Sequence, residues 1–455
     1  MDELIQAVRG TVIRPGDAGY EGARRVYNAD IDRRPAAIVA CADAADVSRG
    51  VGYAHEHGLA VAIRGGGHSA AGFGTCDGGL VLDLSAMKGI RVDAKRRIAR
   101  AEAGCTWGDF DRATQAQGLA TPGGIISTTG LGGLTTGGGF GYLSRLHGLA
   151  CDNVISADVV TAAGTLVAAS ATQNADLFWA IRGGGGNFGV VTAFEFRLHP
   201  VTQVYAGPIL YAPEQAADAM RMYRDFMRSA PRNLSAFFAF LMVPPGPPFP
   251  EPLWLKTVPG IMCAYFGDAA AGEAAIAPLR AFGPPLAALT GPMPYTVLQS
   301  LFDGLLPPGL HHYWKSDFAS DLNDEMIAVH AKFGPQIPTV NSAMHIYPLD
   351  GAIHDVPTGD TAFAYRDVRF VHIIAAVTPE AVRLAGYREW VRAYWSALHP
   401  YSAGGTYVNF LMEEGEQRVS ESYRGNHARL AAIKAQYDPG NVFRVNQNIL
   451  PAHVS

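Results

Sequence analysis

The stretch Arg64-Gly65-Gly66-Gly67-His68-Ser69 follows a short apolar run, Leu59 to Ile63, and is itself followed by more small residues. Three consecutive glycines let a backbone approach a ligand closely, because no Cβ atom stands in the way. The histidine after them places a nucleophilic ring nitrogen at the point of approach. Taken alone, the motif is equally typical of a surface turn that carries a solvated histidine.

Three further glycine clusters lie downstream, at 130–133, 137–141 and 183–189. Together with 65–67 we expect them to line one long groove with backbone N–H groups, an arrangement that suits a pyrophosphate. Few basic side chains accompany these clusters, so the anion would be held mainly by amides. A large, flat cofactor that needs close backbone approach over much of its length is the ligand they predict.

A nicotinamide-dinucleotide site is the alternative that the glycines raise. Residues 184–189 match G-x-G-x-x-G formally, and residues 65–70 match its G/A variant. That fingerprint needs a strand before it and a helix opening from it. Residues 184–189 instead follow an expected helix and precede a strand. Residues 65–70 leave no room for a helix before the next strand. Both contexts argue against a Rossmann fold.

The composition bounds the class of protein. The chain has 455 residues, is 48% hydrophobic and only 17% charged, and carries a net charge of −5, which predicts two or three structural units and argues against nucleic acid or a membrane surface as partner. Five cysteines without a C-x-x-C pair indicate reduced thiols and no metal site. The N-terminus lacks the pattern of a secretion signal, and no apolar run is long enough to span a membrane, so we expect a cytoplasmic protein.

The first part of the chain alternates short strands and helices. The patterns predict strands at 36–42, 59–63, 80–84 and 190–198, and hairpins at 90–103 and 154–169. They predict helices at 43–58, 107–117 and 176–182, and a loop throughout 123–141.

From about residue 201 the pattern changes, with less glycine and more proline. Helices are expected at 214–228, 272–282, 379–398 and 427–437, and strands at 236–243, 262–266, 342–347, 371–377 and 405–411. This is an α+β arrangement, with helices packed on one face of an antiparallel sheet.

Several longer motifs resemble the FAD-linked oxidases of the vanillyl-alcohol-oxidase (PCMH) type, in the berberine-bridge-enzyme-like branch. Beside Arg64 to Ser69, the similar stretches are GLGGLTTGGGFG (130–141), GLACDN (148–153), DLFWAIRGGGGNFGVV (176–191) and YDPGNVFRVNQNI (437–449). They occur in the family's order over residues 33–200 and 405–451, whereas 201–404 matches only loosely.

The resemblance implies an FAD-binding domain made from both ends of the chain, residues 1–200 and 405–455, with a substrate domain at 201–404 inserted between them. In such proteins the histidine that matches His68 bonds covalently to the flavin 8α-methyl group. The other cofactor-binding residues that the resemblance implies are Arg64, Gly65, Gly66, Gly67, Ser69, Thr129, Gly130, Gly133, Gly138, Gly139, Gly141, Asn187, Gly189, Val191, Asn446 and Asn448.

One departure from the family concerns a second covalent link. Many relatives attach flavin C6 to a cysteine four residues before the first glycine of the G-x-G-G segment, and that position here is Ile126. Cys151 lies in a later segment where relatives do not place the linker, so we expect it to be a small buried hydrophobe. The sequence predicts a single link, through His68.

Two further positions bear on the chemistry. Thr129 stands where relatives have a residue that gates oxygen access to the flavin, and its Val-like size predicts that oxygen reaches the cofactor. Tyr407 and Asn409 match a Tyr-x-Asn element on an expected strand, where a period of two puts both on one face.

In relatives that tyrosine acts as a base on a substrate hydroxyl. A phenol with a pKa near 10 needs help for this role at neutral pH. The candidates for that help are Lys315, His345, Tyr347 and Tyr365.

The resemblance implies an oxidase that transfers a hydride from an alcohol, amine or natural-product scaffold to flavin N5 and is reoxidised by O2, giving H2O2. A dehydrogenase with another acceptor, an oxygen-inserting flavoenzyme of secondary metabolism, and a flavin-holding protein with a decayed pocket remain open. Aromatic residues within 201–404, among them Phe237, Phe238, Phe240 and Trp314, favour an apolar or aromatic substrate over a sugar. The partners expected are the substrate and O2, with the chain a monomer or homodimer.

Overall fold

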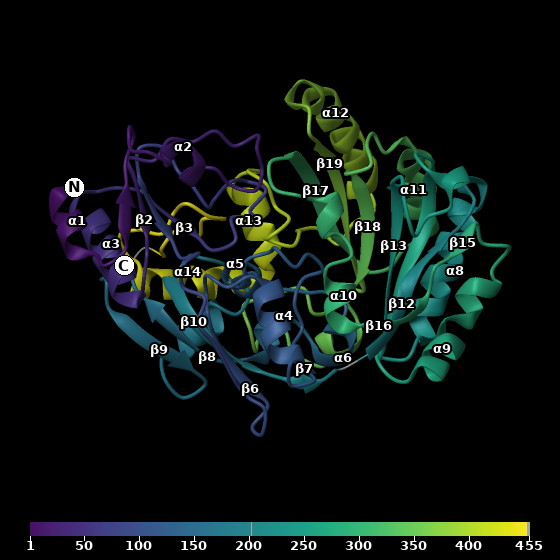
Figure 1. Cartoon of the computed structure of the whole chain (residues 1–455), viewed down its shortest axis with the longest axis horizontal. Coiled ribbons are helices and arrows are strands. Elements are labelled where there is room, and N and C mark those ends of the chain that lie inside the picture. Colours follow the sequence, from purple (N-terminus) through teal and green to yellow (C-terminus); the bar gives the residue numbers. More distant parts are fainter. Residues whose placement is uncertain (202, 453–455) are drawn as a thin grey trace.

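The computed structural model describes residues 1–201 and 203–452. Residues 1–200 and 405–452 share one half of the molecule, and the teal and green segments between them form the other half (Figure 1). Across the described residues, no helix combines the length and the apolar character needed to cross a membrane.

A four-stranded sheet in the order β1-β2-β4-β3 positions the triple glycine. β2 and β3 run parallel to β4, and β1 runs antiparallel to β2. Residues 65–67 leave this sheet directly at the end of β3. The strands are β1 (Thr11–Ile13), β2 (Ala37–Ala40), β3 (Val61–Arg64) and β4 (Leu80–Asp83).

A five-stranded antiparallel sheet, in the order β5-β6-β10-β8-β9, follows in the same half. Helix α3 (Ala44–Glu56) contacts both sheets and begins at Asp43, whose carboxylate accepts hydrogen bonds from the N–H groups of Ala45 and Asp46. The strands are β5 (Ile90–Asp93), β6 (Ile98–Glu102), β8 (Val154–Val160), β9 (Leu166–Ser170) and β10 (Val190–Arg197).

Short elements complete this half. The two-stranded pair is β7 (Leu119–Ala120) with β11 (His199–Pro200). The remaining helices are α1 (Asp2–Ala7), α2 (Tyr20–Ala23), α4 (Trp107–Gln115), α5 (Leu131–Thr136), α6 (Ser144–His147), α7 (Ala175–Ala180), α13 (Glu416–Tyr423) and α14 (His427–Tyr437).

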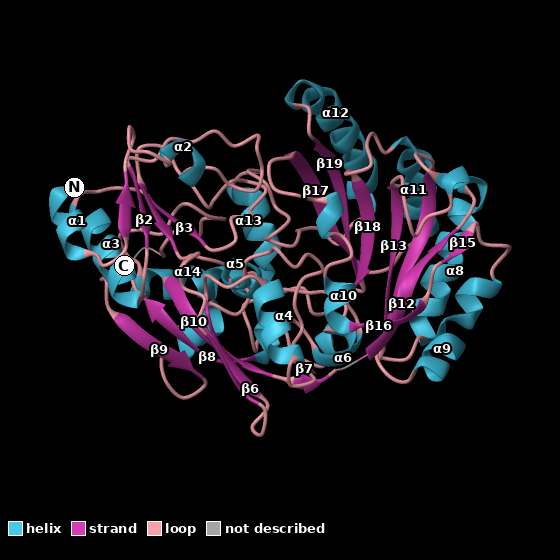
Figure 2. Ribbon diagram, in the orientation of Figure 1, coloured by secondary structure: helices cyan, strands magenta, loops and turns pink. Residues whose placement is uncertain are grey.

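The other half is an eight-stranded antiparallel sheet with most of its helices on one face (Figure 2). Its strand order is β15-β12-β14-β13-β18-β19-β17, with β16 also paired to β12. The strands are β12 (Gln203–Leu210), β13 (Leu234–Met242), β14 (Thr257–Tyr265), β15 (Ala287–Ala288), β16 (Gly291–Pro294), β17 (His311–Ala319), β18 (Ala343–Pro348) and β19 (Phe370–Thr378). The helices are α8 (Ala216–Ser229), α9 (Ala269–Ala281), α10 (Tyr295–Gln299), α11 (Asp324–Phe333) and α12 (Ala381–Leu398).

Alternation along β13 separates the two faces of this sheet. Phe238 and Phe240 pack into the core beneath the helices, where Phe238 lies 5.8 Å from the ring of Tyr223 in α8. Phe237 and Ala239 point the other way, into a separate apolar cluster shared with the first half. The predicted α+β fold, with an antiparallel sheet covered by helices, is confirmed.

Two local predictions are wrong. Residues 405–411 are irregular, with a turn at 408–410 in place of the expected strand, and the N–H groups of Phe410 and Leu411 donate to the carbonyl of Tyr407. Within the expected loop 123–141, residues 131–136 form helix α5, because the buried side chain of Leu131 and tight packing of Gly132 against Ala103 outweigh the low helix propensity of glycine.

Candidate active site

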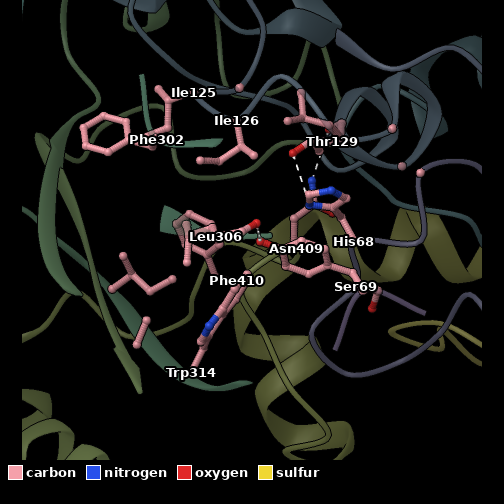
Figure 3. A pocket seen from close by; sticks show the side chains of 18 of the residues that line it. His68, Ser69, Ile125, Ile126, Thr129, Phe302, Leu306, Trp314, Asn409 and Phe410 are labelled. Carbon is pink, nitrogen blue, oxygen red and sulfur yellow. Dashed lines mark hydrogen bonds between the residues drawn. The ribbon is translucent and has the colours of Figure 1, made fainter. Parts of the chain in front are cut away.

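A cavity of about 740 Å³ lies between the two halves of the molecule. Residues from the β3 loop, the 124–134 segment and the C-terminal tail form one side, and the face of the eight-stranded sheet opposite α8, α9, α11 and α12 forms the other. Figure 3 looks into it: His68, Thr129, Asn409, Phe410 and Trp314 gather around the open space.

His68 is half-buried at the cavity wall and is held on two sides. The ring of Tyr27 stacks on it at 3.9 Å with an interplanar angle of 17°. Its Nε2 lies 3.0 Å from the hydroxyl of Thr128, and its Nδ1 lies 3.4 Å from the hydroxyl of Thr129. Burial lowers the pKa of His68 to about 4, so the imidazole is neutral at neutral pH and keeps a free lone pair.

Arg64 also lines the cavity, but its charge already has a partner. Its guanidinium donates to the carboxylate of Asp83 at 2.6 Å and to the carbonyl of Arg25 at 3.3 Å. Because that cation is neutralised, an anionic ligand in the cavity depends on backbone amides, as the sparse basic residues of the sequence predicted.

The glycines open the backbone to the cavity at several points. A Cβ atom added to Gly66 would lie 2.3 Å from the backbone nitrogen of Gly130, so these two segments touch only because both are glycine. A Cβ atom added to Gly133 or Gly186 would meet no protein atom within 4 Å, and both residues line the cavity. Their bare backbone therefore faces open space, where a ligand can approach it.

The 137–141 cluster has a different place, and the prediction of one groove lined by all four clusters is wrong for it. Gly138, Gly139 and Gly141 are not among the residues that line the cavity. The N–H of Gly139 instead donates to the hydroxyl of Tyr407 at 3.0 Å. Gly138 packs against Phe363, and Gly141 packs against the carbonyl of Gly123, so these glycines lie behind the cavity wall, which Phe140 reaches.

The remaining predicted cofactor residues divide into cavity-facing and structural ones. Ser69, Thr129, Gly189, Val191 and Asn446 line the cavity. Asn446 and Asn448 each keep a buried side-chain oxygen without a hydrogen-bond partner among the described residues, but Asn448 does not reach the cavity wall.

Asn187 also lines the cavity, yet its amide serves the fold. The side-chain nitrogen donates to the carbonyls of Gly184 and Gln447, and the side-chain oxygen accepts from the N–H of Ile449. Asn187 therefore fixes the C-terminal tail against the 183–189 cluster.

Tyr407 and Asn409 meet in the cavity although they are not on a strand. The side-chain amide of Asn409 donates to the Tyr407 hydroxyl at 2.7 Å, beside the N–H of Gly139. Burial raises the pKa of Tyr407 well above its usual value, while these two donors act to lower it. Since the phenol oxygen accepts both bonds, its own proton is free to point elsewhere.

Four side chains were expected to assist Tyr407 as a base. Lys315 forms an ion pair with Glu414 and lies over the ring of Trp395, away from the cavity. The Tyr365 hydroxyl donates to the carbonyl of Glu421, also outside the cavity. His345 and Tyr347 line the cavity but hydrogen-bond to each other at 2.6 Å. The groups that hydrogen-bond to the Tyr407 oxygen are instead the N–H of Gly139 and the amide of Asn409.

Ile126 lines the cavity at the position where relatives carry the second linking residue. Cys151 is fully buried in the apolar cluster beside Leu149, as predicted for a small hydrophobe. All five cysteines are buried and unpaired.

Tyr27 and Phe140 are cavity residues that the sequence patterns missed. Tyr27 belongs to no motif and reaches His68 from 41 residues upstream, so no local signal indicates it. Phe140 lies within a motif, but only packing against the rings of Tyr407 and Tyr347, at 4.8 and 5.3 Å, reveals its position.

The cavity fits the expected FAD. The bare backbone at Gly133 and Gly186 leaves room for a bulky group, and the unpartnered oxygen of Asn446 offers an acceptor at the wall. His68 presents a neutral ring nitrogen to the same space. Those features suit a large cofactor held by amides and attached through a histidine.

Comparisons with known proteins agree with this fit. The FAD binding domain family matches residues 35–170, and the "Berberine and berberine like" family matches residues 406–450. An FAD-linked oxidoreductase of Dictyostelium discoideum is 33% identical over 99% of this chain and 97% of its own length. A chitooligosaccharide oxidase of Gibberella zeae is 31% identical over 96% of this chain and 91% of its own length.

Among solved structures, 6-hydroxy-D-nicotine oxidase from Arthrobacter nicotinovorans superposes with a TM-score of 0.87 at 28% identity, covering 98% of each chain. The similarity extends over both halves of the molecule and so includes the walls of the cavity. The chain is therefore an FAD-dependent oxidoreductase and belongs to the berberine-bridge-enzyme-like branch of the vanillyl-alcohol-oxidase type.

Proposed function

We propose that the protein is an oxidase that removes a hydride from a C–H carbon of a small organic substrate and delivers the electrons to O2. The substrate loses two hydrogens, for example when an alcohol becomes a carbonyl compound, and O2 gains both and becomes H2O2. The observation that supports this proposal is that His68, bare glycine backbone and the Tyr407–Asn409 pair all face one cavity.

FAD would be attached covalently through His68 alone. A neutral ring held between Tyr27 and the hydroxyls of Thr128 and Thr129 is suited to bond formation, and Ile126 has no sulfur for a second link. When bound, FAD supplies the hydride acceptor at N5 and the route of the electrons to oxygen.

The chain would hold the rest of FAD mainly through backbone groups. We assign this role to cavity-facing residues of the predicted set, which are Arg64, Gly65, Gly66, Gly67, Ser69, Thr129, Gly130, Gly133, Asn187, Gly189, Val191 and Asn446. Gly139 donates to Tyr407 instead, Gly138 and Gly141 pack behind the cavity wall, and Asn448 lies outside the cavity lining.

Tyr407 would take the proton from the substrate hydroxyl as the hydride leaves. Its oxygen already accepts bonds from Gly139 and Asn409, and both bonds strengthen when the oxygen carries negative charge. The two donors thereby stabilise the phenolate, which is the form of Tyr407 that can act as a base.

Oxygen access favours an oxidase over a dehydrogenase. Thr129 is small, faces the cavity and lies beside His68, so it leaves a path for O2 near the attached cofactor. Slow reoxidation of the reduced protein in air would favour the dehydrogenase, and oxygen atoms in the product would favour the oxygen-inserting alternative.

We also propose that residues 1–200 and 405–455 form the FAD-binding domain and 201–404 the substrate domain. The two walls of the cavity come from these two parts, which supports the division. A cytoplasmic monomer or homodimer remains our expectation.

The first experiment is to precipitate the purified protein in acid and map the flavin-bearing peptide by mass. Yellow colour in the pellet and FAD on the His68 peptide would support the proposal, with His68→Ala as the variant that releases the colour. Colour in the supernatant, or a cysteine thioether in the peptide, would contradict the single covalent link.

A further inference from the structure

We propose that the substrate is a neutral aromatic alcohol, rather than a charged molecule or a sugar; this rests on the proposed function. The inference comes from the wall that the eight-stranded sheet presents to the cavity. That wall is apolar, aromatic and nearly free of charge.

Strand alternation sends one set of side chains from each central strand into the cavity. From β13 these are Phe237, Ala239 and Leu241, and from β19 they are Ile373, Ala375 and Val377. Trp314 of β17 and the pair His345 and Tyr347 of β18 complete the set. Two of the aromatic residues that suggested an aromatic substrate from the sequence, Phe238 and Phe240, do not line the cavity.

Aromatic rings form a nearly continuous wall next to Tyr407. Phe410 lies 5.0 Å from Tyr407 and 6.0 Å from Trp314, measured between ring centroids. On the other side Phe237 lies 5.0 Å from both Tyr347 and His345. Such rings bind another flat ring through apolar contact and edge-to-face packing.

Charge is almost absent from the lining. Among the described residues, Arg64 is the only lysine, arginine, aspartate or glutamate that lines the cavity, and Asp83 neutralises it. Burial lowers the pKa of His345 to about 4, so this ring is uncharged at neutral pH. A carboxylate or an ammonium group would therefore lose its hydration without gaining a partner.

Hydrogen-bonding groups on the sheet wall are few. The amide of Asn341 uses one N–H on the carbonyl of Leu305, and the hydroxyl of Ser342 donates to the carbonyl of Val377. The hydrogen-bonded His345–Tyr347 pair keeps one N–H or O–H unused in either histidine tautomer, whereas the indole N–H of Trp314 is buried within the wall. These few groups match one or two oxygens, whereas a disaccharide brings many hydroxyls that would stay unsatisfied.

Further apolar residues line the cavity. They are the segment Pro244–Phe249, together with Leu301, Leu305 and Leu306. A neutral alcohol passes such a surface without the desolvation cost of an ion, and the hydroxyl beside its C–H carbon supplies the proton that Tyr407 takes.

The test uses the flavin-loaded enzyme without oxygen and four probes: benzyl alcohol, benzylamine, 4-(hydroxymethyl)benzoate and cellobiose. Binding is read from the shift of the flavin absorption spectrum, and oxidation from its bleaching. We expect benzyl alcohol to shift or bleach the spectrum and the other three to do so more weakly or not at all. Equal or stronger response to cellobiose or to a charged probe, or no response to benzyl alcohol, would overturn the inference.

The two proposals fail in different ways. A protein that carries no flavin contradicts the proposed function before any probe is added. Bleaching by cellobiose with slow or no response to benzyl alcohol overturns the aromatic substrate but leaves the oxidase standing.

A charge placed in the wall gives a second, independent measurement. Leu306 points into the cavity (Figure 3), and Leu306→Lys adds a cation there. We expect the ratio of affinities to shift toward 4-(hydroxymethyl)benzoate over benzyl alcohol by about tenfold. Leu255→Lys, at an exposed residue outside the cavity, is the matched control, and an unchanged ratio in both variants would contradict a charge-free wall as the selecting feature.

Discussion

At Tyr407 the phenol oxygen accepts hydrogen bonds from Gly139 and Asn409, at 3.0 and 2.7 Å, while the ring is almost completely buried. Burial and hydrogen bonding act on the pKa in opposite directions, and burial is the larger effect. The residue is therefore a neutral phenol at rest, and its phenolate fraction rises with pH. This balance makes the rate of proton removal sensitive to each donor.

Tyr407→Phe is expected to lower turnover by about 10²- to 10⁴-fold, because the ring stays packed against Phe140 and Phe410 while the base is lost. The flavin-to-protein ratio should not change. Steady-state kinetics with an oxidised substrate, together with the absorption spectrum, measures both quantities. Unchanged turnover would remove Tyr407 from the reaction.

Asn409→Leu removes one donor to the Tyr407 oxygen and leaves the Gly139 N–H in place. Losing a donor to the charged form raises the pKa of Tyr407, so the pH at which the rate increases should shift upward by about one to two units. The pH profile of kcat/KM tests this shift. A profile that keeps its position while only stability changes would indicate a structural role.

Tyr27 determines the orientation of His68 through ring stacking at 3.9 Å. In Tyr27→Ala the histidine gains contact with water, its pKa returns toward about 6.5, and protonation at pH 6 should slow attachment of flavin. The fraction of covalent flavin, read as fluorescence of the denatured protein on a gel, should fall. Tyr27→Phe keeps the stacked ring and loses only the hydrogen bond from the hydroxyl to the carbonyl of Leu306. Its fraction of covalent flavin should therefore be close to that of the unmodified protein.

At the scale of elements, the C-terminal helix and tail are held by one buried ion pair. Lys434 of α14 donates to Asp438 at 2.7 Å and to the carbonyls of Asn187 and Phe443, and both charged side chains are fully buried. Asp438 in turn accepts from the N–H groups of Val442 and Phe443. This network places Asn446 and Gln447 at the cavity.

Lys434→Met is expected to lower the free energy of unfolding by about 3–5 kcal/mol, because it leaves a buried carboxylate without a partner. Urea denaturation of the purified variant measures the loss. Lys332→Met, at an exposed position on α11, is the control and should change stability little. Similar small losses in both variants would contradict the role of the pair.

At the scale of the whole molecule, several histidines are buried in the neutral form. Burial lowers the pKa of His68, His147, His199 and His345 to about 4, and that of His312 and His372 to about 3. In the unfolded chain each would titrate near 6.5. The unfolded state therefore binds more protons between these values, and stability rises with pH across that window.

We expect the melting temperature to fall steadily as the pH is lowered from 6.5 to 4. The cost is at most about 1.4 kcal/mol per pH unit for each fully buried histidine, and less for His147 and His199, which solvent partly screens. His312→Phe removes one buried histidine, whose two ring nitrogens have no hydrogen-bond partners among the described residues. The melting temperature of this variant should therefore depend less on pH. His55→Gln, at an exposed residue of α3, is the control and should leave it unchanged. A melting temperature that is constant from pH 6.5 to 4 would contradict this account.

Local sequence patterns were sufficient to predict the positions of most helices and strands. Apolar runs and glycine breaks located β2, β3 and β4, and Asp43 marked the start of α3, because capping and strand periodicity depend on neighbouring residues alone. The motifs, through the resemblance they carry, were sufficient for the family and its cofactor.

Only the tertiary structure decided how the site is assembled. The alternation at 405–411 is typical of a strand, but the segment has no strand partner and turns, and Tyr407 meets Asn409 by a side-chain hydrogen bond instead. Gly139 and Tyr407 are 268 residues apart in sequence, and Tyr27 reaches His68 outside any motif. Contacts of this kind depend on how the two halves pack. The spacing of residues along the chain therefore identified the glycine clusters, but it did not predict which glycines face the cavity and which one contacts Tyr407.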